Sequence, residues 1–235
     1  MKKLYKIADL IVAMDSFGRT AKQAERYMCD TSDEVNIEIT SYMKLAKSAY
    51  PQESDDLCEY MGTGKSFYQQ LINYDGIMLH SSAVVVDGKA YLFTADSGTG
   101  KSTHTNLWLE SFPGAFILND DKPALRRIDG VWYAYGTPWS GKYDISTNAS
   151  AELAGIALLE RGSENAIEPC NPREAILRIY MQLNRKTETP EFREKQLELL
   201  DRLLTEVPIW KLKCNMDPEA AIVSYNAMFG YEKEK

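Results

Sequence analysis

The sequence predicts an α/β protein in which a mixed, partly antiparallel sheet is flanked by helices and a small N-terminal lobe contains further strands. Three observations support this: Asp-Gly dipeptides join two pairs of β-rich segments, a glycine-rich loop lies between a strand and a helix, and two helix starts occur in the C-terminal third. The chain of 235 residues is 44% hydrophobic and 26% charged, which suits one sizeable core with a smaller lobe. We place the N-terminal lobe at residues 1–75 and the main domain at residues 76–235.

The N-terminal lobe is expected to combine strands with helices. Residues 5–14 and 35–40 are rich in β-branched side chains and are predicted strands, separated by a helix over 20–28. Apolar residues recur at helical spacing over 56–74, where Gly62 and Gly64 predict a break in the helix.

The main domain begins with strand pairs. Residues 77–86 and 90–94 are joined by Asp87-Gly88, and residues 124–128 and 131–135 by Asp129-Gly130. Asp-Gly suits a type I′ turn, in which both central residues need positive φ. We therefore expect two antiparallel hairpins, with the glycine-rich loop, a helix and a strand between them. That helix is predicted over residues 102–110 and the strand over 115–119.

The C-terminal part is predicted to be mostly helical. Asn171-Pro172 and Asp217-Pro218 each combine an N-cap residue with a proline at the first helical position. A helix over 191–206 and a strand over 207–214 are expected between these starts.

Composition excludes several classes of function. A net charge of −7 argues against general affinity for nucleic acid or for an anionic membrane surface. Lys6 and Asp9 interrupt the apolar N-terminal stretch, and no run of eighteen apolar residues occurs, so we expect neither an export signal nor a membrane span. A cytoplasmic protein is the resulting expectation. The four cysteines are far apart in sequence and the chain has two histidines, which argues against zinc or redox motifs and favours free thiols.

The pentapeptide GTGKS occurs twice, at Gly62–Ser66 and at Gly98–Ser102. A phosphate-binding loop needs a strand before it and a helix after it, because the helix N-terminus directs its dipole and free N–H groups at the phosphates. Only the second copy has this context. The first copy is expected to be a helix break with a solvated Lys65.

The second copy belongs to the glycine-rich loop, Ala95–Ser102, which matches GxxxxGK[ST] except for Ala95 at the first glycine position. It predicts a site for ATP with Mg²⁺. Lys101 is expected to neutralise the β- and γ-phosphates and the Ser102 hydroxyl to ligate Mg²⁺. The full predicted nucleotide-binding set is Asp96, Ser97, Gly98, Thr99, Gly100, Lys101, Ser102 and Thr103.

An acidic pair, Asp120-Asp121, follows the predicted strand 115–119, which we expect beside the strand that leads into the glycine-rich loop. One aspartate would contact Mg²⁺, with Asp120 the candidate, and Asp121 would be the general base for the acceptor hydroxyl. Which aspartate has which role stays open, as does the alternative of two aspartates in a polar turn.

The stretch from residue 77 to about 162 resembles the kinase domain of the HPr serine kinase/phosphorylase family, whose nucleotide site is akin to that of phosphoenolpyruvate carboxykinase. The resemblance rests on His80 in LHSSAVVVDG, on ADSGTGKST and on ILNDDKPAL. It implies that the loop binds ATP, that His80 lies near the aspartate pair, and that Asp120 and Asp121 divide metal contact and base duties. His104 is assigned to a helix face with no catalytic role.

The second signature of that family, which carries a metal-binding glutamate, is not recognisable here, so the resemblance implies neither phosphorolysis nor HPr as substrate. The loop Gly136–Lys142 stands in its place. We expect Lys142 to reach the transferring phosphoryl group and Trp139 to shield it from water, with a solvated lysine as the alternative.

These observations favour a kinase acting on a hydroxyl of a small molecule or of a peptide serine or threonine. A second hypothesis is a nucleotide-dependent binding module that turns over slowly or never. A carboxykinase would need a transition-metal site, for which two histidines are too few. The oligomeric state stays open, a homo-oligomer included.

Overall fold

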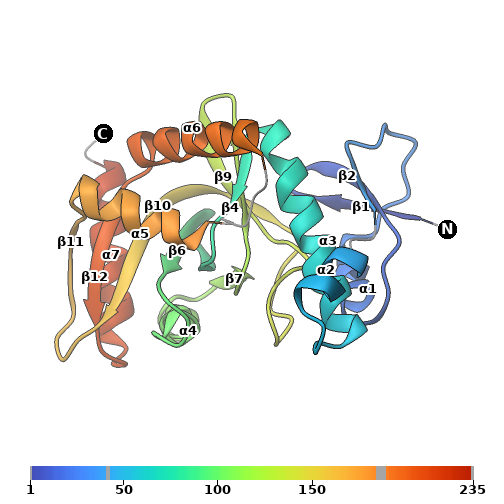
Figure 1. Ribbon diagram of the computed structural model, residues 1–235. Helices are drawn as coiled ribbons and strands as arrows, with labels where there is room; N and C mark the ends of the chain where they lie inside the picture. The colour runs from blue at the N-terminus through green and yellow to red at the C-terminus, as the bar shows by residue number, and fades with distance from the viewer. Residues whose placement is uncertain (1, 41–42, 184–188, 234–235) are drawn as a thin grey trace.

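The computed structural model describes residues 2–40, 43–183 and 189–233. Within these residues a three-stranded sheet and a nine-stranded mixed sheet are present, with helices around them (Figure 1). The predicted α/β class with a partly antiparallel sheet and a strand-containing N-terminal region is confirmed. No helix in these three segments is long and apolar enough to cross a membrane.

The small sheet consists of β1 (Lys3–Ile7), β2 (Leu10–Met14) and β3 (Ile37–Ile39). The single strand predicted over 5–14 is wrong, because Ala8 and Asp9 both adopt positive φ and turn the chain into an antiparallel hairpin. β3 then adds parallel to β2. The associated helices are α1 (Gly18–Ala24), α2 (Met43–Ala49) and α3 (Asp55–Leu71), with short 3₁₀ turns at Glu25–Tyr27 and Ile72–Tyr74.

Helix α3 continues through the first GTGKS copy, so the predicted helix break is wrong. Ser54 caps its N-terminus by accepting a hydrogen bond from the N–H of Leu57. Gly62 and Gly64 are buried within the helix, and a Cβ at Gly64 would lie 2.8 Å from the indole of Trp139. The glycine therefore permits a close approach of α3 to that ring.

The large sheet has the order β4-β8-β9-β10-β6-β5-β7, with β12 pairing with β10 and β11 with β12. Its strands are β4 (Gly76–Met78), β5 (Ser82–Val86), β6 (Lys89–Thr94), β7 (Phe116–Asn119), β8 (Ala124–Ile128), β9 (Val131–Tyr135), β10 (Ser150–Arg161), β11 (Ala166–Pro169) and β12 (Ile209–Cys214). The helices are α4 (Lys101–Ser111), α5 (Pro172–Gln182), α6 (Pro190–Glu206) and α7 (Glu219–Lys233).

Both predicted Asp-Gly hairpins are confirmed. β5 and β6 pair antiparallel across Asp87 and Gly88, whose φ angles are 51° and 77°. β8 and β9 do the same across Asp129 and Gly130, at 49° and 88°. The predicted strand 77–86, by contrast, is divided into β4 and β5, which lie in different parts of the sheet.

The acidic strand β7 pairs with β5, so its expected place beside the loop strand β6 is wrong. The short hairpin puts β5 on that side of β6, and β10 takes the other side. Because β5 is antiparallel to both β6 and β7, these two strands run in the same direction. β10 and β12 are also parallel to β6. The carboxyl ends of β6, β7, β10 and β12 therefore meet at one edge, which is where ligands bind in open α/β sheets.

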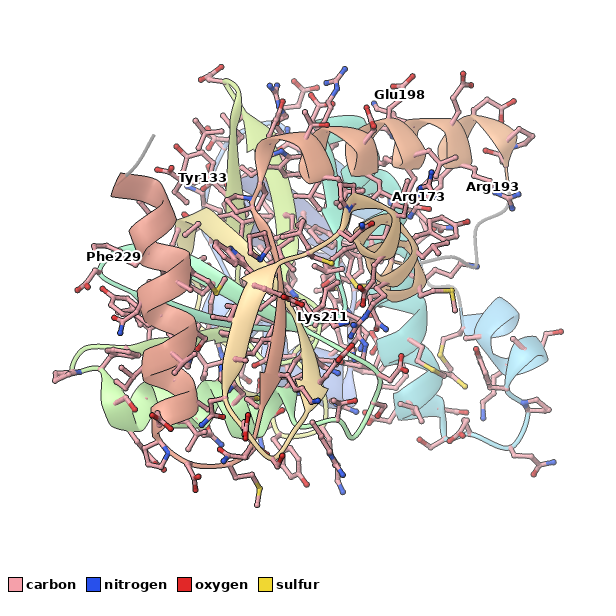
Figure 2. The ribbon with its side chains drawn as sticks, turned by 90° about the vertical axis from the view of Figure 1, so that its left-hand side faces the viewer. Tyr133, Arg173, Arg193, Glu198, Lys211 and Phe229 are labelled. Atoms are coloured by element: carbon pink, nitrogen blue, oxygen red, sulfur yellow. The ribbon has the colours of Figure 1, made fainter. Side chains whose placement is uncertain are left out.

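Helices cover both faces of the large sheet (Figures 1 and 2). α4 and α7 pack on one face around Trp108 and Met228, and α5 and α6 pack on the other around Ile179 and Leu203. Figure 2 shows charged side chains such as Glu198 on the outer side of α6, as expected for an amphipathic helix. A third core joins the small sheet and α3 to Trp139.

Candidate functional site

The glycine-rich loop connects the end of β6 to the start of α4 at the carboxyl edge of the sheet. Gly98 and Gly100 have φ angles of 79° and 123°, and a Cβ at either would meet nothing within 4 Å. Glycine is needed here for backbone conformation and leaves the peptide groups accessible to a ligand. Ala95 is buried and is not among the residues with positive φ, so the missing first glycine causes no strain.

Lys101 lies inside the loop, 9% exposed, and its ammonium donates to the carbonyl of Ala95 at 2.9 Å. Burial lowers the pKa of Lys101, while the carboxylates of Asp121 and Asp120 raise it in part. The two aspartates are thus close enough to act on the ammonium electrostatically. The structure brings the predicted lysine and the predicted acidic pair to one site.

Asp120 is linked to the helix that follows the loop. Its Oδ1 accepts a hydrogen bond from Ser82 Oγ at 2.5 Å, and Ser82 Oγ lies 2.8 Å from Thr105 Oγ1 on α4. Its backbone N–H donates to Ile145. The carboxylate is therefore oriented relative to α4, although β5 lies between β7, which leads to Asp120, and β6, which leads to the loop and α4.

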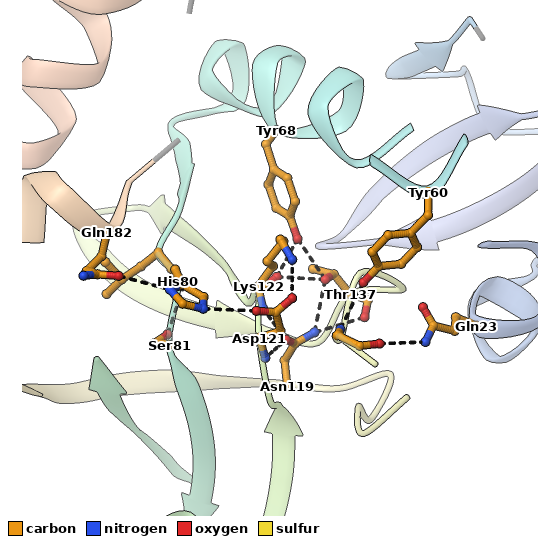
Figure 3. A network of polar contacts seen from close by, with 12 residues as sticks. Gln23, Tyr60, Tyr68, His80, Ser81, Asn119, Asp121, Lys122, Thr137 and Gln182 are labelled. Atoms are coloured by element: carbon orange, nitrogen blue, oxygen red, sulfur yellow. Dashed lines mark hydrogen bonds and ion pairs between the residues drawn. The ribbon is translucent and has the colours of Figure 1, made fainter. Parts of the chain in front are cut away.

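Asp121 lies between two basic side chains (Figure 3). Its Oδ1 is 3.2 Å from His80 Nε2, and Lys122 pairs with its Oδ2. Burial raises the pKa of Asp121, but the hydrogen bond from His80 and the charge of Lys122 outweigh it, so the pKa is below its ordinary value. Asp121 is consequently ionised at neutral pH.

The turn that carries both aspartates is fixed by the buried side chain of Asn119. Its Oδ1 accepts from the backbone N–H groups of Asp121 and Lys122 at 2.9 and 2.7 Å. Its amide donates to the carbonyl of Thr137 at 3.0 Å. Tyr68 on α3 hydrogen-bonds the Lys122 carbonyl, so the helix of the first GTGKS copy supports this turn.

Four further residues at the site were not predicted: Ser82, Lys122, Arg161 and Gln182. Arg161, at the end of β10, donates from Nε to the carbonyl of Thr99 and from Nη2 to that of Gly98, at 3.0 and 2.5 Å. Lys122 follows the acidic pair directly, and this adjacency was the one available signal in the sequence. The others come from strand and helix ends that only the tertiary fold brings to the loop.

The loop Gly136–Lys142 differs from its expected role. Trp139 is 1% exposed and stacks on Phe67 of α3, with ring centroids 4.9 Å apart, so it is a core residue and not a wall above the site. Lys142 is exposed, and its ammonium lies over the ring of Tyr143. Gly141 of this loop does approach Asp121, since a Cβ there would lie 3.1 Å from the Asp121 Cβ.

His104 lies on the face of α4 that is buried against α7. Its Nε2 is 3.1 Å from Ser224 Oγ and accepts a hydrogen bond from the indole of Trp108. Burial lowers the pKa of His104 to about 4. It is therefore a neutral residue between α4 and α7, consistent with its predicted lack of a catalytic role.

Pockets lie on both flanks of the glycine-rich loop. One of about 230 Å³ is lined by Asp96 and Gln182 together with apolar side chains of β10 and α5. Another, of about 390 Å³, is lined by Thr103 at the start of α4 and by Arg161 and Met216. The first lies on the side of His80, to which Gln182 is hydrogen-bonded.

The candidate Mg²⁺ ligands are Ser102 and Asp120, and Asp121 follows Asp120 in the sequence. Among the described residues no three His, Cys, Asp or Glu side chains form a metal cluster. Mg²⁺ bound with a nucleotide typically uses one or two carboxylates, with phosphates and waters completing the coordination. The oxygen donors at this edge of the sheet fit that mode.

Comparison with known proteins finds a distant structural relationship. No family model matches the chain, and no curated protein matches it. Among solved structures, the chain is similar to the HPr(Ser) kinase/phosphatase from Coxiella burnetii, with 13% sequence identity and a TM-score of 0.39. The match covers 66% of this chain and 98% of that one.

Proposed function

We propose that the chain is an ATP- and Mg²⁺-dependent kinase that transfers the γ-phosphoryl group to a hydroxyl of a small molecule or of a peptide serine or threonine. The observation that carries this proposal is the position of Asp121. Its ionised carboxylate, bonded to His80, lies at the same sheet edge as the glycine-rich loop and is near enough to influence Lys101.

In this proposal the N–H groups of the loop and the ammonium of Lys101 bind the β- and γ-phosphates. Mg²⁺, held by Ser102 and Asp120, would supply positive charge against the phosphate oxygens. The acceptor oxygen forms a bond to the γ-phosphorus, the bond from that phosphorus to the β–γ bridging oxygen breaks, and ADP leaves. The hydroxyl proton passes to Asp121.

The two pockets suit the two substrates. Thr103 follows the Mg²⁺-binding serine in the first turn of α4, at the end of the loop whose N–H groups would bind the α- and β-phosphates. The pocket lined by Thr103 and Arg161 would therefore take the nucleoside. The pocket lined by Asp96 and Gln182 would take the acceptor, because it lies on the side of His80 and Asp121.

The test is incubation of the pure protein with γ-labelled ATP, Mg²⁺ and a panel of hydroxyl metabolites and serine or threonine peptides. Lys101→Ala should abolish transfer and weaken ATP binding. Asp121→Asn should remove transfer, by roughly a hundredfold or more, and leave ATP affinity nearly unchanged. Transfer by Lys101→Ala would refute the loop as the active site, and normal transfer by Asp121→Asn would refute the base assignment.

The alternative of a nucleotide-dependent binding module has one observation in its favour. Both oxygens of Asp121 are already bonded, to His80 and to Lys122, and two basic partners weaken a carboxylate as a proton acceptor. A wild-type protein that binds ATP and changes conformation, but forms no product with any acceptor, would support the module and overturn the kinase.

A further inference from the structure

We propose that Gln182 is a positioning residue, whose carboxamide fixes the orientation in which His80 faces Asp121 and couples that pair to the glycine-rich loop. The inference deepens the proposed function and rests on it for its kinetic consequences. Its structural core, the hydrogen-bonding state of His80, can be tested without any activity.

Gln182 bridges two parts of the site, and Figure 3 shows its contact with His80. Its Oε1 lies 3.0 Å from His80 Nδ1, and its Nε2 donates to Oδ1 of Asp96, in the loop, at 3.1 Å. The backbone reinforces the contact, because the N–H of His80 donates to the Gln182 carbonyl at 3.0 Å and Leu79 forms a bridge with Leu183. The last residue of α5 is thus held against His80 by both main chain and side chain.

The direction of each hydrogen bond follows from the groups at the two ends. The ionised carboxylate of Asp96 can only accept, so the NH₂ group of Gln182 must face it. The amide oxygen then faces His80, so Nδ1 of the imidazole donates to it while Nε2 donates to the carboxylate of Asp121; both ring nitrogens are then donors, as in a protonated imidazole. The reversed amide would set its oxygen against a carboxylate, at a cost comparable to a lost hydrogen bond to a charged group.

The direction of the hydrogen bond between His80 and Gln182 determines which ring nitrogen of His80 faces Asp121. With Nδ1 committed to Gln182, the ring cannot turn by 180° without losing that bond, and Nε2 stays directed at Asp121 Oδ1. Removal of the carboxamide would free the ring, so Asp121 would lose a fixed partner while Lys101 kept its own contacts in the loop. We therefore expect turnover to fall more than ATP affinity.

Gln182→Met keeps the length of the side chain and removes both hydrogen bonds. Its kcat should fall by about 10- to 100-fold, the range found when partners that orient a reactive group are removed, with the Kd for ATP changed by less than about threefold. Leu177→Ala alters the wall of the same pocket and would change the KM for the acceptor instead. An equal loss of kcat in Leu177→Ala would assign the effect to the pocket.

A stricter test exchanges the hydrogen-bond donor and acceptor between residues 182 and 96. Gln182→Glu can still accept from His80 but sets a carboxylate against Asp96. Adding Asp96→Asn supplies an NH₂ donor for the new carboxylate, so the double variant should be at least about tenfold more active than Gln182→Glu alone. If the double variant is no more active than Gln182→Glu, the proposed bridge from Asp96 through Gln182 to His80 is wrong.

The activity-independent measurement is ¹⁵N NMR of the imidazole rings, which is tractable because the chain has two histidines. Gln182→Met should change the Nδ1 signal of His80, whereas Gln70→Met, which removes an amide of α3 that donates to the carbonyl of Glu38, should not. The buried ring of His104 reports whether the fold is intact; if Gln182→Met unfolds, the comparison uses Gln182→Ala, which also removes both hydrogen bonds of the carboxamide. An unchanged His80 signal would overturn the proposal, and a changed signal in a protein without transfer would refute the kinase alone.

Discussion

The backbone of Gly64 on α3 lies directly against the indole of Trp139, at a distance that leaves no room for a Cβ. Trp139 stacks in turn on Phe67, one helical turn further along. The GTGKS string at Gly62–Ser66 is thus part of a helix–loop contact that holds residues 136–141 next to Asp121. Identical pentapeptides have different roles in this chain because one follows a strand and the other lies within a helix.

Gly64→Ala is expected to destabilise the protein by roughly 2 kcal/mol, because the added methyl would overpack the indole and outweigh the better helix propensity of alanine. Urea denaturation gives the free energy of unfolding. Gly230→Ala is the matched control in α7, where a Cβ meets nothing within 4 Å, and it should stabilise by about 0.5–1 kcal/mol. Equal effects at the two sites would contradict the packing argument.

The contributions of Lys122 and Lys142 to phosphoryl transfer can be distinguished by replacing each lysine with methionine. Lys122→Met should lower phosphoryl transfer by about 10- to 100-fold, because Oδ2 of Asp121 loses the partner that orients the carboxylate, and this loss outweighs the gain in its basicity. Lys142→Met should change it by less than about twofold, since that ammonium lies over Tyr143 in solvent. Initial rates at saturating ATP decide the matter, and the reverse order would restore Lys142 as the residue that contacts the phosphoryl group.

Asn119→Ala should cost roughly 3 kcal/mol, because the buried side chain bonds two backbone N–H groups of the acidic turn and a carbonyl. The turn would then lose its fixed geometry, so transfer should fall as well. Asn148→Ala removes an exposed amide that donates to the Arg26 carbonyl and should cost less than about 1 kcal/mol. Thermal unfolding of both variants beside the wild type is the measurement.

Glu59 predicts a pH dependence of stability. Burial, with the charge of Asp56 added, raises the pKa of Glu59 from 4.5 to about 7, against the opposing hydrogen bond from Thr20. The folded state therefore binds a proton that the unfolded state releases, and this stabilisation is lost as pH rises from about 5 to above 7. In Glu59→Gln that loss, roughly 2 kcal/mol, should be absent. Urea unfolding at pH 5 and pH 8 tests it, and parallel pH profiles of the two proteins would contradict it.

Local signals in the sequence predicted most of the elements. The Asp-Gly turns and the N-cap at Asn171 depend on neighbouring residues alone, so they can be predicted from the sequence directly. β10 was missed because its alanine, leucine and glutamate residues favour helices, and burial between β9, β6 and β12 overrides that preference.

In the site, too, the residues within contiguous motifs were predictable and those brought together by the tertiary fold were not. The glycine-rich loop and the acidic pair were found from contiguous residues, and His80 from a resemblance. Arg161 and Gln182 come from the ends of β10 and α5, 59 and 80 residues beyond Ser102, and no short-range pattern marks them. Trp139 was misassigned because no local pattern indicates that α3 covers it.

The core shared by the small N-terminal sheet, α3 and Trp139 has a consequence for biosynthesis. As the chain leaves the ribosome, β1, β2 and β3 are complete about a hundred residues before the indole that packs with them is made. The part of this core that Trp139 completes stays without that partner over the interval, which at about 5–20 residues per second lasts about 5–20 seconds. The N-terminal segment is therefore where we expect a chaperone to bind the nascent protein, and where an early stop in translation would leave an aggregating fragment.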